Sequence, residues 1–231
     1  MTTLRIVYTK ENYMSFLGHL ELMKLFERVF RYNKLPLKFS EGFNPIPKMT
    51  YASPLSVGYS SKAEVMEVQL ESEVPLSDIL KLNFPDGIKV VDAAYVTSKK
   101  SLMASLTHSE YLIKVEFKQS IQQLPIDEWI QDFLNQSEVL YEKKAKNGNM
   151  RSLNIIELID SLKIVYKGEQ EMILRAIVQT GSQGSLNPET LVKVMCKHFG
   201  IPQEIDNIRV ERLQLFFKNE DKLTPLFEMS V

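Results

Sequence analysis

The segment 16–31, FLGHLELMKLFERVFR, leads into LPLKFSEGFNPIPK at 35–48, and this pair decides the fold of the first part of the chain. Apolar residues recur in the first segment at spacings of three and four, the pattern of an amphipathic helix. The predicted core stripe is Phe16, Leu20, Met23, Phe26 and Phe30. We expect Ser15 to be the N-cap, and Arg28 and Arg31 near the end suit the helix dipole. The second segment is a turn stiffened by proline and glycine, where binding groups are often held.

Strands and a second, shorter helix surround this pair. Leu37 and Phe39 begin a strand that the turn interrupts and 49–52 resumes. Residues 63–70 alternate between apolar and polar, which predicts a strand with one face in solvent. The remaining predicted elements are strands at 4–8 and 88–96 and a helix at 75–82. The resulting order, β-α-β-β-α-β, is the ferredoxin-like pattern.

The same order recurs in the second half of the chain. Strands are predicted at 110–118, 139–143, 162–166, 172–179 and 208–218, and helices at 126–135 and 188–199. Asn187 and Pro188 begin the last helix as N-cap and N1. Residues 153–159 fit a strand or a helical turn. We therefore predict an α+β protein of two tandem ferredoxin-like modules, 1–97 and 110–231, joined by a polar linker at 98–109. One larger α/β domain with mixed pairing is the alternative.

Composition excludes several classes of function. The chain has 231 residues, 44% of them apolar, and a formal net charge of −1, so no global charge draws it to nucleic acid or anionic membrane. Cys196 is the single cysteine, which rules out an internal disulfide and a thiolate site for zinc or an iron–sulfur cluster. We predict no metal site and no cofactor. No apolar run has the length of a signal peptide or membrane span, so we expect a cytoplasmic protein without membrane contact.

The candidate site residues gather around the turn. Between His19 and Lys48 there are six basic residues and three acidic ones. The predicted binding residues are His19, Arg28, Arg31, Lys38, Ser40, Asn44, Lys48 and, further along, Arg151. A solvated charged face is the plain explanation. The functional one is a basic groove for phosphates, with Phe39, Phe43, Tyr51 or Tyr59 available to stack on bases. His19 is the one candidate for acid–base catalysis, although an inert helix histidine explains it as well.

Three stretches carry a family resemblance: 16–31, 35–48 and PLSVGYSS at 54–61, followed by Glu64. Together they resemble the bacterial radical-SAM-linked proteins, a family of unknown function whose members occur alone or fused behind a radical-SAM domain. Ile46 departs from the family pattern, in which a histidine stands at that place of G-F-N-P-H-P-K. The resemblance implies a radical-SAM protein as partner, which would supply the cluster that this chain cannot bind.

Three functions remain open from the sequence. The first is a non-catalytic binding protein that presents RNA, or an RNA-associated substrate, to a radical-SAM partner. The second is a metal-independent endoribonuclease that uses His19, by analogy with ferredoxin-like endoribonucleases that cleave CRISPR repeats. The third is a protein–protein adaptor without a nucleic-acid role.

Overall fold

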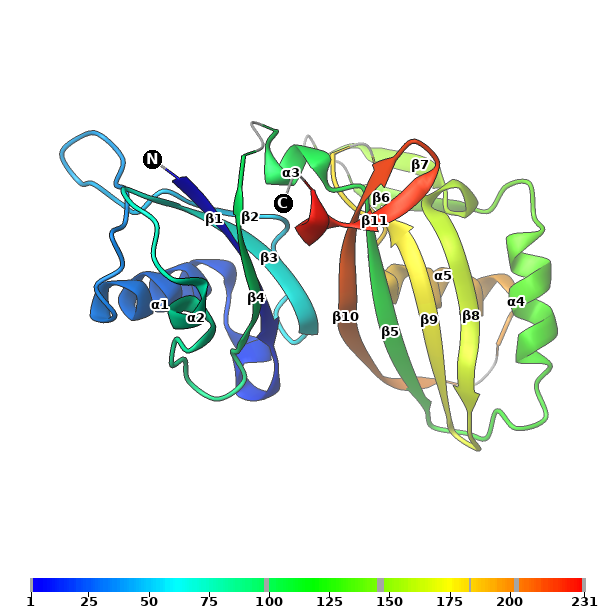
Figure 1. The fold of residues 1–231 in the computed structure, drawn as a ribbon. Helices are drawn as coiled ribbons and strands as arrows, with labels where there is room; N and C mark the ends of the chain where they lie inside the picture. The colour runs from blue at the N-terminus through cyan, green and yellow to red at the C-terminus, as the bar shows by residue number, and fades with distance from the viewer. Residues whose placement is uncertain (1, 98–99, 145–147, 183, 202–203, 230–231) are drawn as a thin grey trace. The chain divides into compact units, whose positions relative to one another are not determined.

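A computed structural model describes residues 2–97, 100–144, 148–182, 184–201 and 204–229 (Figure 1). Contacts divide the chain into two units, Met1–His108 with Glu211–Val231, and Ser109–Val210. The predicted modules differ from these units in one respect, because 211–231 packs with the first unit. Residues 98–99, at the start of the predicted linker, lie outside the described residues.

The first unit combines a sheet with two helices and several short elements. It contains β1 (Thr2–Lys10), η1 (Asn12–Phe16), α1 (His19–Tyr32), β2 (Met49–Tyr51), β3 (Ser60–Leu70), α2 (Leu76–Leu80), β4 (Val90–Val96), α3 (Leu102–Ser105), β11 (Lys222–Pro225), η3 (Leu226–Glu228) and the second part of β10 (Ile205–Asn219). The strand order is β4-β1-β3, with β2 on the other side of part of β3, and all three pairings are antiparallel. Glu211 and Arg212 of β10 pair in parallel with Ser60 and Ser61 of β3.

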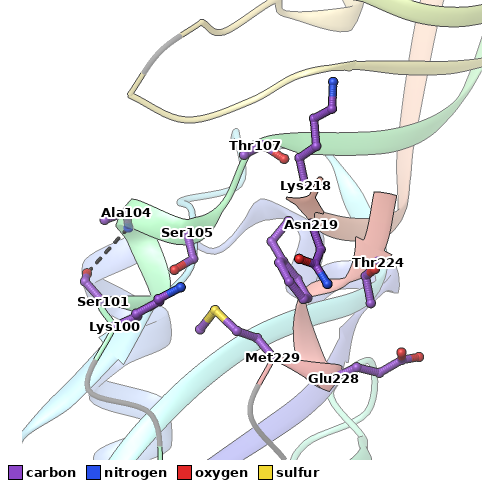
Figure 2. A pocket seen from close by; sticks show the side chains of 11 residues that line it. Lys100, Ser101, Ala104, Ser105, Thr107, Lys218, Asn219, Thr224, Glu228 and Met229 are labelled. Atoms are coloured by element: carbon purple, nitrogen blue, oxygen red, sulfur yellow. Dashed lines mark hydrogen bonds between the residues drawn. The ribbon is translucent and has the colours of Figure 1, made fainter. Parts of the chain in front are cut away.

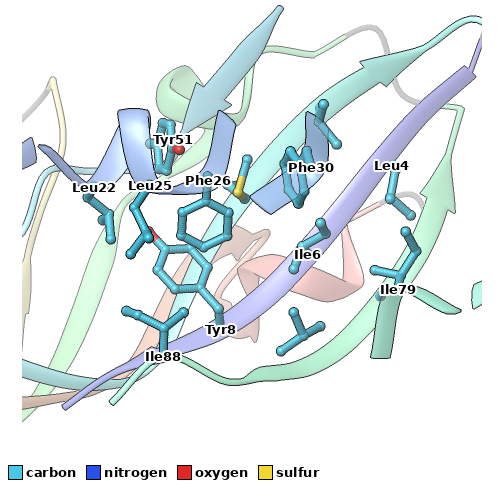
Figure 3. Close-up of a cluster of buried hydrophobic side chains, with 14 of the residues drawn as sticks. Leu4, Ile6, Tyr8, Leu22, Leu25, Phe26, Phe30, Tyr51, Ile79 and Ile88 are labelled. Carbon is cyan, nitrogen blue, oxygen red and sulfur yellow. The ribbon is translucent and has the colours of Figure 1, made fainter. Parts of the chain in front are cut away.

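One hydrophobic core lies between α1 and the sheet. Leu22, Leu25, Phe26 and Phe30 are the buried residues of α1. Figure 3 shows them against Leu4, Ile6 and Tyr8 of β1. The rings of Tyr8 and Phe26 meet edge to face with centroids 4.7 Å apart, a favourable aromatic geometry.

The helix begins four residues later than the sequence predicts. Ser15 lies in η1, where its hydroxyl donates to the carbonyl of Asn12 at 2.6 Å. It is therefore not the N-cap of α1, which is Gly18. Phe16 and Leu20, predicted as core, are 66% and 71% exposed. The apolar stripe that reaches the core starts one turn further on, at Leu22.

Both faces of the middle of β3 are buried, which corrects the prediction of one solvent face. Met66 and Val68 belong to the core under α1. Ala63 and Val65 belong to a second cluster, which also holds Leu102, Leu106, Leu215, Leu226 and Met229. Short-range alternation could not reveal this layer, because α3 and the last residues of the chain supply it.

The second unit holds the remaining elements. They are β5 (His108–Phe117), α4 (Ile126–Leu134), β6 (Leu140–Lys144), β7 (Met150–Asn154), η2 (Ile156–Leu158), β8 (Ile159–Lys167), β9 (Glu171–Gln179), α5 (Pro188–His198) and the first part of β10. The strand order is β10-β5-β9-β8, and β6 and β7 form a separate two-stranded sheet. Asn187 caps α5 as predicted, since its side chain accepts from the amides of Glu189 and Thr190. The α+β class is confirmed.

Candidate functional site

The turn singled out in the sequence is a short, internally bonded loop, which we call the Phe43 loop (residues 38–48). Its stem is closed by two hydrogen bonds of 2.8 Å, from the Lys48 amide to the Lys38 carbonyl and from the Ser40 amide to the Ile46 carbonyl. The Ser40 hydroxyl accepts from the Ile46 amide at 3.0 Å. Figure 1 shows this segment, in light blue, projecting from the first unit. The predicted contact of Ser40 with a ligand is replaced by one that locks the stem.

The tip of the Phe43 loop is exposed. Residues 41–45, including Asn44, are all exposed, and the Phe43 side chain is 106% exposed. Of the four aromatic residues predicted as stacking candidates, Tyr51 and Tyr59 are buried. Phe39 is half-buried, and the guanidinium carbon of Arg31 lies 4.8 Å above its ring centroid. Phe43 is therefore the member of this set that can stack on a base.

The predicted basic residues do not all face one groove. Lys38 and Lys48 are neighbours on the stem. Arg31 bonds Glu27 at 2.8 Å, one turn earlier on α1. Arg28 lines a groove of about 560 Å³ that also contains Glu21, Glu27 and Lys24. Arg151 lies in the second unit on β7, directly opposite Lys143 of β6.

His19 is the first residue of α1 and is half-buried. Its ring stands edge to face against the ring of Tyr51, with centroids 5.1 Å apart. Among the described residues, no hydrogen bond to the His19 ring is found. A catalytic histidine needs a partner that orients it or exchanges its proton, so this geometry favours binding over catalysis.

A buried polar cluster lies beneath the start of α1, and the sequence did not point to it. One guanidinium nitrogen of Arg212 contacts both carboxylate oxygens of Glu64, at 3.1 and 3.2 Å, and both side chains are almost fully buried. The Lys10 ammonium donates to the carbonyls of Ser15 at 3.1 Å and Leu17 at 2.8 Å. The one available signal was the charge of Lys10 and Glu64 within strands that are otherwise apolar.

Burial shifts the pKa values of this cluster in the direction of the neutral forms. It raises the pKa of Tyr8 well above that of an exposed phenol, and Glu64 adds to the rise. It also raises the pKa of Tyr51. Burial lowers the pKa of Lys10, an effect that Glu64 opposes and Arg212 reinforces. Both phenols are therefore hydrogen-bond donors at neutral pH.

A second hollow of the first unit is polar and open. Figure 2 shows this groove of about 760 Å³ between α3 and residues of β10, β11 and η3. Ser105, Thr107 and Asn219 line it, and the Ser101 hydroxyl accepts from the Ala104 amide within α3. These side chains are exposed or half-buried. Water satisfies such groups without a ligand, so this groove carries no assignment.

The second unit has a groove of about 580 Å³ between β6 and α5. Lys193, Lys197 and His198 line it, and Lys193 bonds Glu189 at 3.3 Å. Cys196 is buried whereas His198 is exposed, so the two point apart as their spacing predicts. No cluster of three His, Cys, Asp or Glu side chains suited to a metal occurs within the described residues.

Comparison with known proteins adds a family. Residues 3–188 match the family described as an uncharacterized protein conserved in bacteria (DUF2344). The chain belongs to this family. The predicted resemblance to a bacterial family of unknown function is thus confirmed at that level. No curated protein matches the chain. Within the described ranges, no helix is long and apolar enough to cross a membrane.

Solved structures resemble the chain in fold. A chain of a Cbf5-Nop10-Gar1 complex gives a TM-score of 0.55 at 12% identity, covering 94% of this chain and 50% of that one. The archaeal box H/ACA sRNP Nop10-Cbf5 complex gives 0.49 at 12% identity, covering 90% and 46%. An H/ACA RNP bound to a substrate RNA containing 2'-deoxyuridine gives 0.48 at 10% identity, covering 91% and 46%. This chain spans about half the length of these relatives.

Proposed function

We propose that this chain is a cytoplasmic binding protein that holds single-stranded RNA on its first unit and presents it to a radical-SAM partner. The observation that carries the proposal is the Phe43 loop, in which a bonded stem holds a fully exposed aromatic ring in solvent. A large apolar side chain held at a rigid tip is poised to contact a partner. Stacking of a base on such a ring contributes about 1–3 kcal/mol.

Charge on the stem supports RNA as the occupant. Lys38 and Lys48 are adjacent across the stem, at the base of the loop that carries Phe43. Among the described residues, no carboxylate lies within ion-pair distance of Arg28, Lys34 or Lys48. Cations beside an aromatic ring form the pattern by which proteins bind single strands without reading their sequence.

The radical-SAM partner follows from the family resemblance and from chemistry. Cys196, the single cysteine, is buried, and burial raises its pKa to about 11, so it is no thiolate ligand at neutral pH. A reaction that needs an iron–sulfur cluster would therefore take place on the partner. This chain would contribute binding and positioning of the substrate.

We also infer that the two units are tandem ferredoxin-like modules. In the first unit, numbering its four strands along the chain gives the spatial order 4-1-3-2, from β4-β1-β3 and β2 on β3. In the second unit, β10-β5-β9-β8 gives the same order, with the β6–β7 hairpin inserted after α4. Two matching strand orders support a repeated module.

Binding of a labelled single-stranded RNA, measured by fluorescence anisotropy at several salt concentrations, tests the function. We expect Phe43→Ala to weaken binding by about tenfold, the effect of one lost stacking contact. We expect the triple variant Arg28→Ala/Arg31→Ala/Lys48→Ala to lower both the affinity and the salt slope. Tyr166→Ala, which removes a half-exposed ring from β8 in the second unit, is the matched control. Unchanged affinity and slope in both test variants would exclude this surface.

A second function has one observation in its favour. His19 lies against Tyr51, whose buried hydroxyl has no hydrogen-bond partner among the described residues. An endoribonuclease of this kind would lose cleavage of a structured RNA in His19→Ala. Equal cleavage by the wild type and the variant would end this alternative. Co-purified RNA is expected with a binding protein, whereas a protein partner without RNA would favour the adaptor.

A further inference from the structure

The start of α1 has unsatisfied donors. The amides of the first turn of a helix have no acceptor within the helix, and a side chain of the N-cap residue usually supplies one. The N-cap of α1 is Gly18, which has no side chain. The carboxylate of Glu21 accepts from the Gly18 amide at 2.8 Å. Within the described residues, the amides of His19, Leu20 and Glu21 are left without an acceptor.

A buried hydroxyl adds an independent donor at the same place. The Tyr51 side chain belongs to a residue only 7% exposed, and its hydroxyl has no hydrogen-bond partner among the described residues. Its ring contacts the ring of His19, the first residue of the helix. Figure 3 shows Tyr51 at the end of α1 where Leu22 lies, away from Phe30. A buried hydroxyl without a partner costs about 1–3 kcal/mol, a cost that an acceptor from outside would remove.

The buried charge at this end of the helix is positive. Glu64 and Arg212 neutralise each other. Lys10 is buried with them, and the carbonyls it bonds, of Ser15 and Leu17, immediately precede the helix. No carboxylate among the described residues lies within ion-pair distance of its ammonium. The helix dipole adds about half a positive charge at the same end.

We propose that the N-terminus of α1 binds a phosphoryl group through its free amides, His19 and the hydroxyl of Tyr51, with Lys10 behind them. The ligand class follows because these groups are donors or cations and a helix N-terminus is a common site for phosphate. Glu21 is the opposing charge, so its removal strengthens binding.

The phosphate of RNA is the source that the neighbouring surface favours, and this step rests on the proposed function. Tyr13 and Phe16 of η1 are 85% and 66% exposed. Residues three apart in a 3-10 helix lie on the same side, so the two rings share one face, two residues before α1. A base joined to the bound phosphate would have rings to stack on.

Titration with inorganic phosphate, followed by amide NMR, tests the site without RNA. We expect saturable shifts of the His19, Leu20 and Glu21 amides, and an affinity about tenfold lower in Tyr51→Phe, which loses one hydrogen bond to a charged group. Glu21→Gln should bind phosphate more tightly. The Glu189 and Thr190 amides of α5, already capped by Asn187, are the internal control. Equal affinity in Tyr51→Phe and the wild type overturns the site.

Tyr51→Phe should remain folded, since the deleted hydroxyl has no partner among the described residues. A melting temperature equal to or above that of the wild type confirms this, so a loss of phosphate binding is not a loss of fold. A lower melting temperature together with lost binding overturns the assignment of a free hydroxyl.

Competition with RNA identifies the source. If a short single-stranded RNA displaces inorganic phosphate from the His19 amide in the Phe43→Ala variant, the helix binds an RNA phosphate independently of the loop. If phosphate binds and RNA does not displace it from the wild type, the site is one for free phosphate and its assignment to RNA is wrong. Loss of RNA affinity in Phe43→Ala with no phosphate shift in the wild type supports the proposed function and overturns this site.

Discussion

Glu64 of β3 and Arg212 of β10 form a buried ion pair although 148 positions of sequence separate them. The Arg212 guanidinium also donates to the carbonyls of Ser53 and Pro54, each at 3.4 Å. The pair therefore joins the end of the chain to β3 and to the loop after β2. It lies under the start of α1, where the proposed phosphate site is built.

Breaking this pair from one side should be costly. Arg212→Met leaves the Glu64 carboxylate buried without its cation, so we expect the free energy of unfolding to fall by about 3–5 kcal/mol. Glu64→Leu/Arg212→Met should lose much less than the sum of the single variants, because no uncompensated charge remains. Urea unfolding of the four proteins measures the coupling. Lys193→Ala, which breaks an exposed pair with Glu189, should change stability by less than about 1 kcal/mol. Additive losses would show that the pair is not coupled.

Arg5 should hold the last described residues in place. Its side chain is fully buried, contacts Glu67 at 2.6 Å, and donates to the carbonyls of Leu226, Phe227 and Met229. In Arg5→Met these carbonyls lose their donor, so hydrogen exchange of 226–229 should rise before that of β5. Arg175→Met, which breaks a more exposed pair with Glu110, is the control. Equal protection of 226–229 in the wild type and Arg5→Met would contradict the anchoring role.

Local patterns predicted the elements, whereas the buried polar contacts escaped them. The spacing of Leu22, Phe26 and Phe30 predicts α1, and Asn187 with Pro188 predicts the start of α5. The start of α1 was misplaced because Ser15 has the chemistry of an N-cap, while its hydroxyl is used inside η1. Nothing near Glu64 in the sequence indicates Arg212, and nothing near Arg5 indicates 226–229. Such pairs are set by strand order, which a single sequence does not contain.

The same limit applies to the candidate site. His19, Lys48 and the turn at 38–48 could be selected by residue type, because glycine, proline and positive charge are visible along the chain. Tyr51 was proposed as a stacking residue and is buried instead. Its unpartnered hydroxyl exists only because β2 brings it against α1, which residue type cannot show.

Stability should fall at alkaline pH through Cys196. Burial raises the pKa of its thiol from 9.0 to about 11. As pH rises between these values, the unfolded chain loses this proton while the folded chain keeps it, so the free energy of unfolding falls. Below this window the thiol is protonated in both states and contributes no pH dependence. The full effect of two pKa units is about 3 kcal/mol.

The Cys196→Ala variant isolates this contribution. Urea unfolding from about pH 8 to about pH 11 should show a shallower decline in the variant than in the wild type. Burial also raises the pKa of Tyr8 and Tyr51, so both proteins retain the part of the decline that comes from the phenols. Parallel curves would show that Cys196 is not protected from ionisation in the folded state.

Gly18→Ser should separate helix stability from phosphate binding. Gly18 has a φ of −69°, and a Cβ built there meets the Glu21 carboxylate at an ordinary 3.4 Å, so serine fits without strain. The new hydroxyl can accept from the amides of the first turn, which should raise the free energy of unfolding by a few tenths of a kcal/mol or about 0.5 at most. The same amides would then be less available to a phosphoryl group. We therefore expect a variant that is slightly more stable and binds inorganic phosphate more weakly, measured by urea unfolding and by NMR titration of the His19 amide. If the variant is more stable and binds phosphate as tightly as the wild type, the free amides of α1 are not the ligands of the anion.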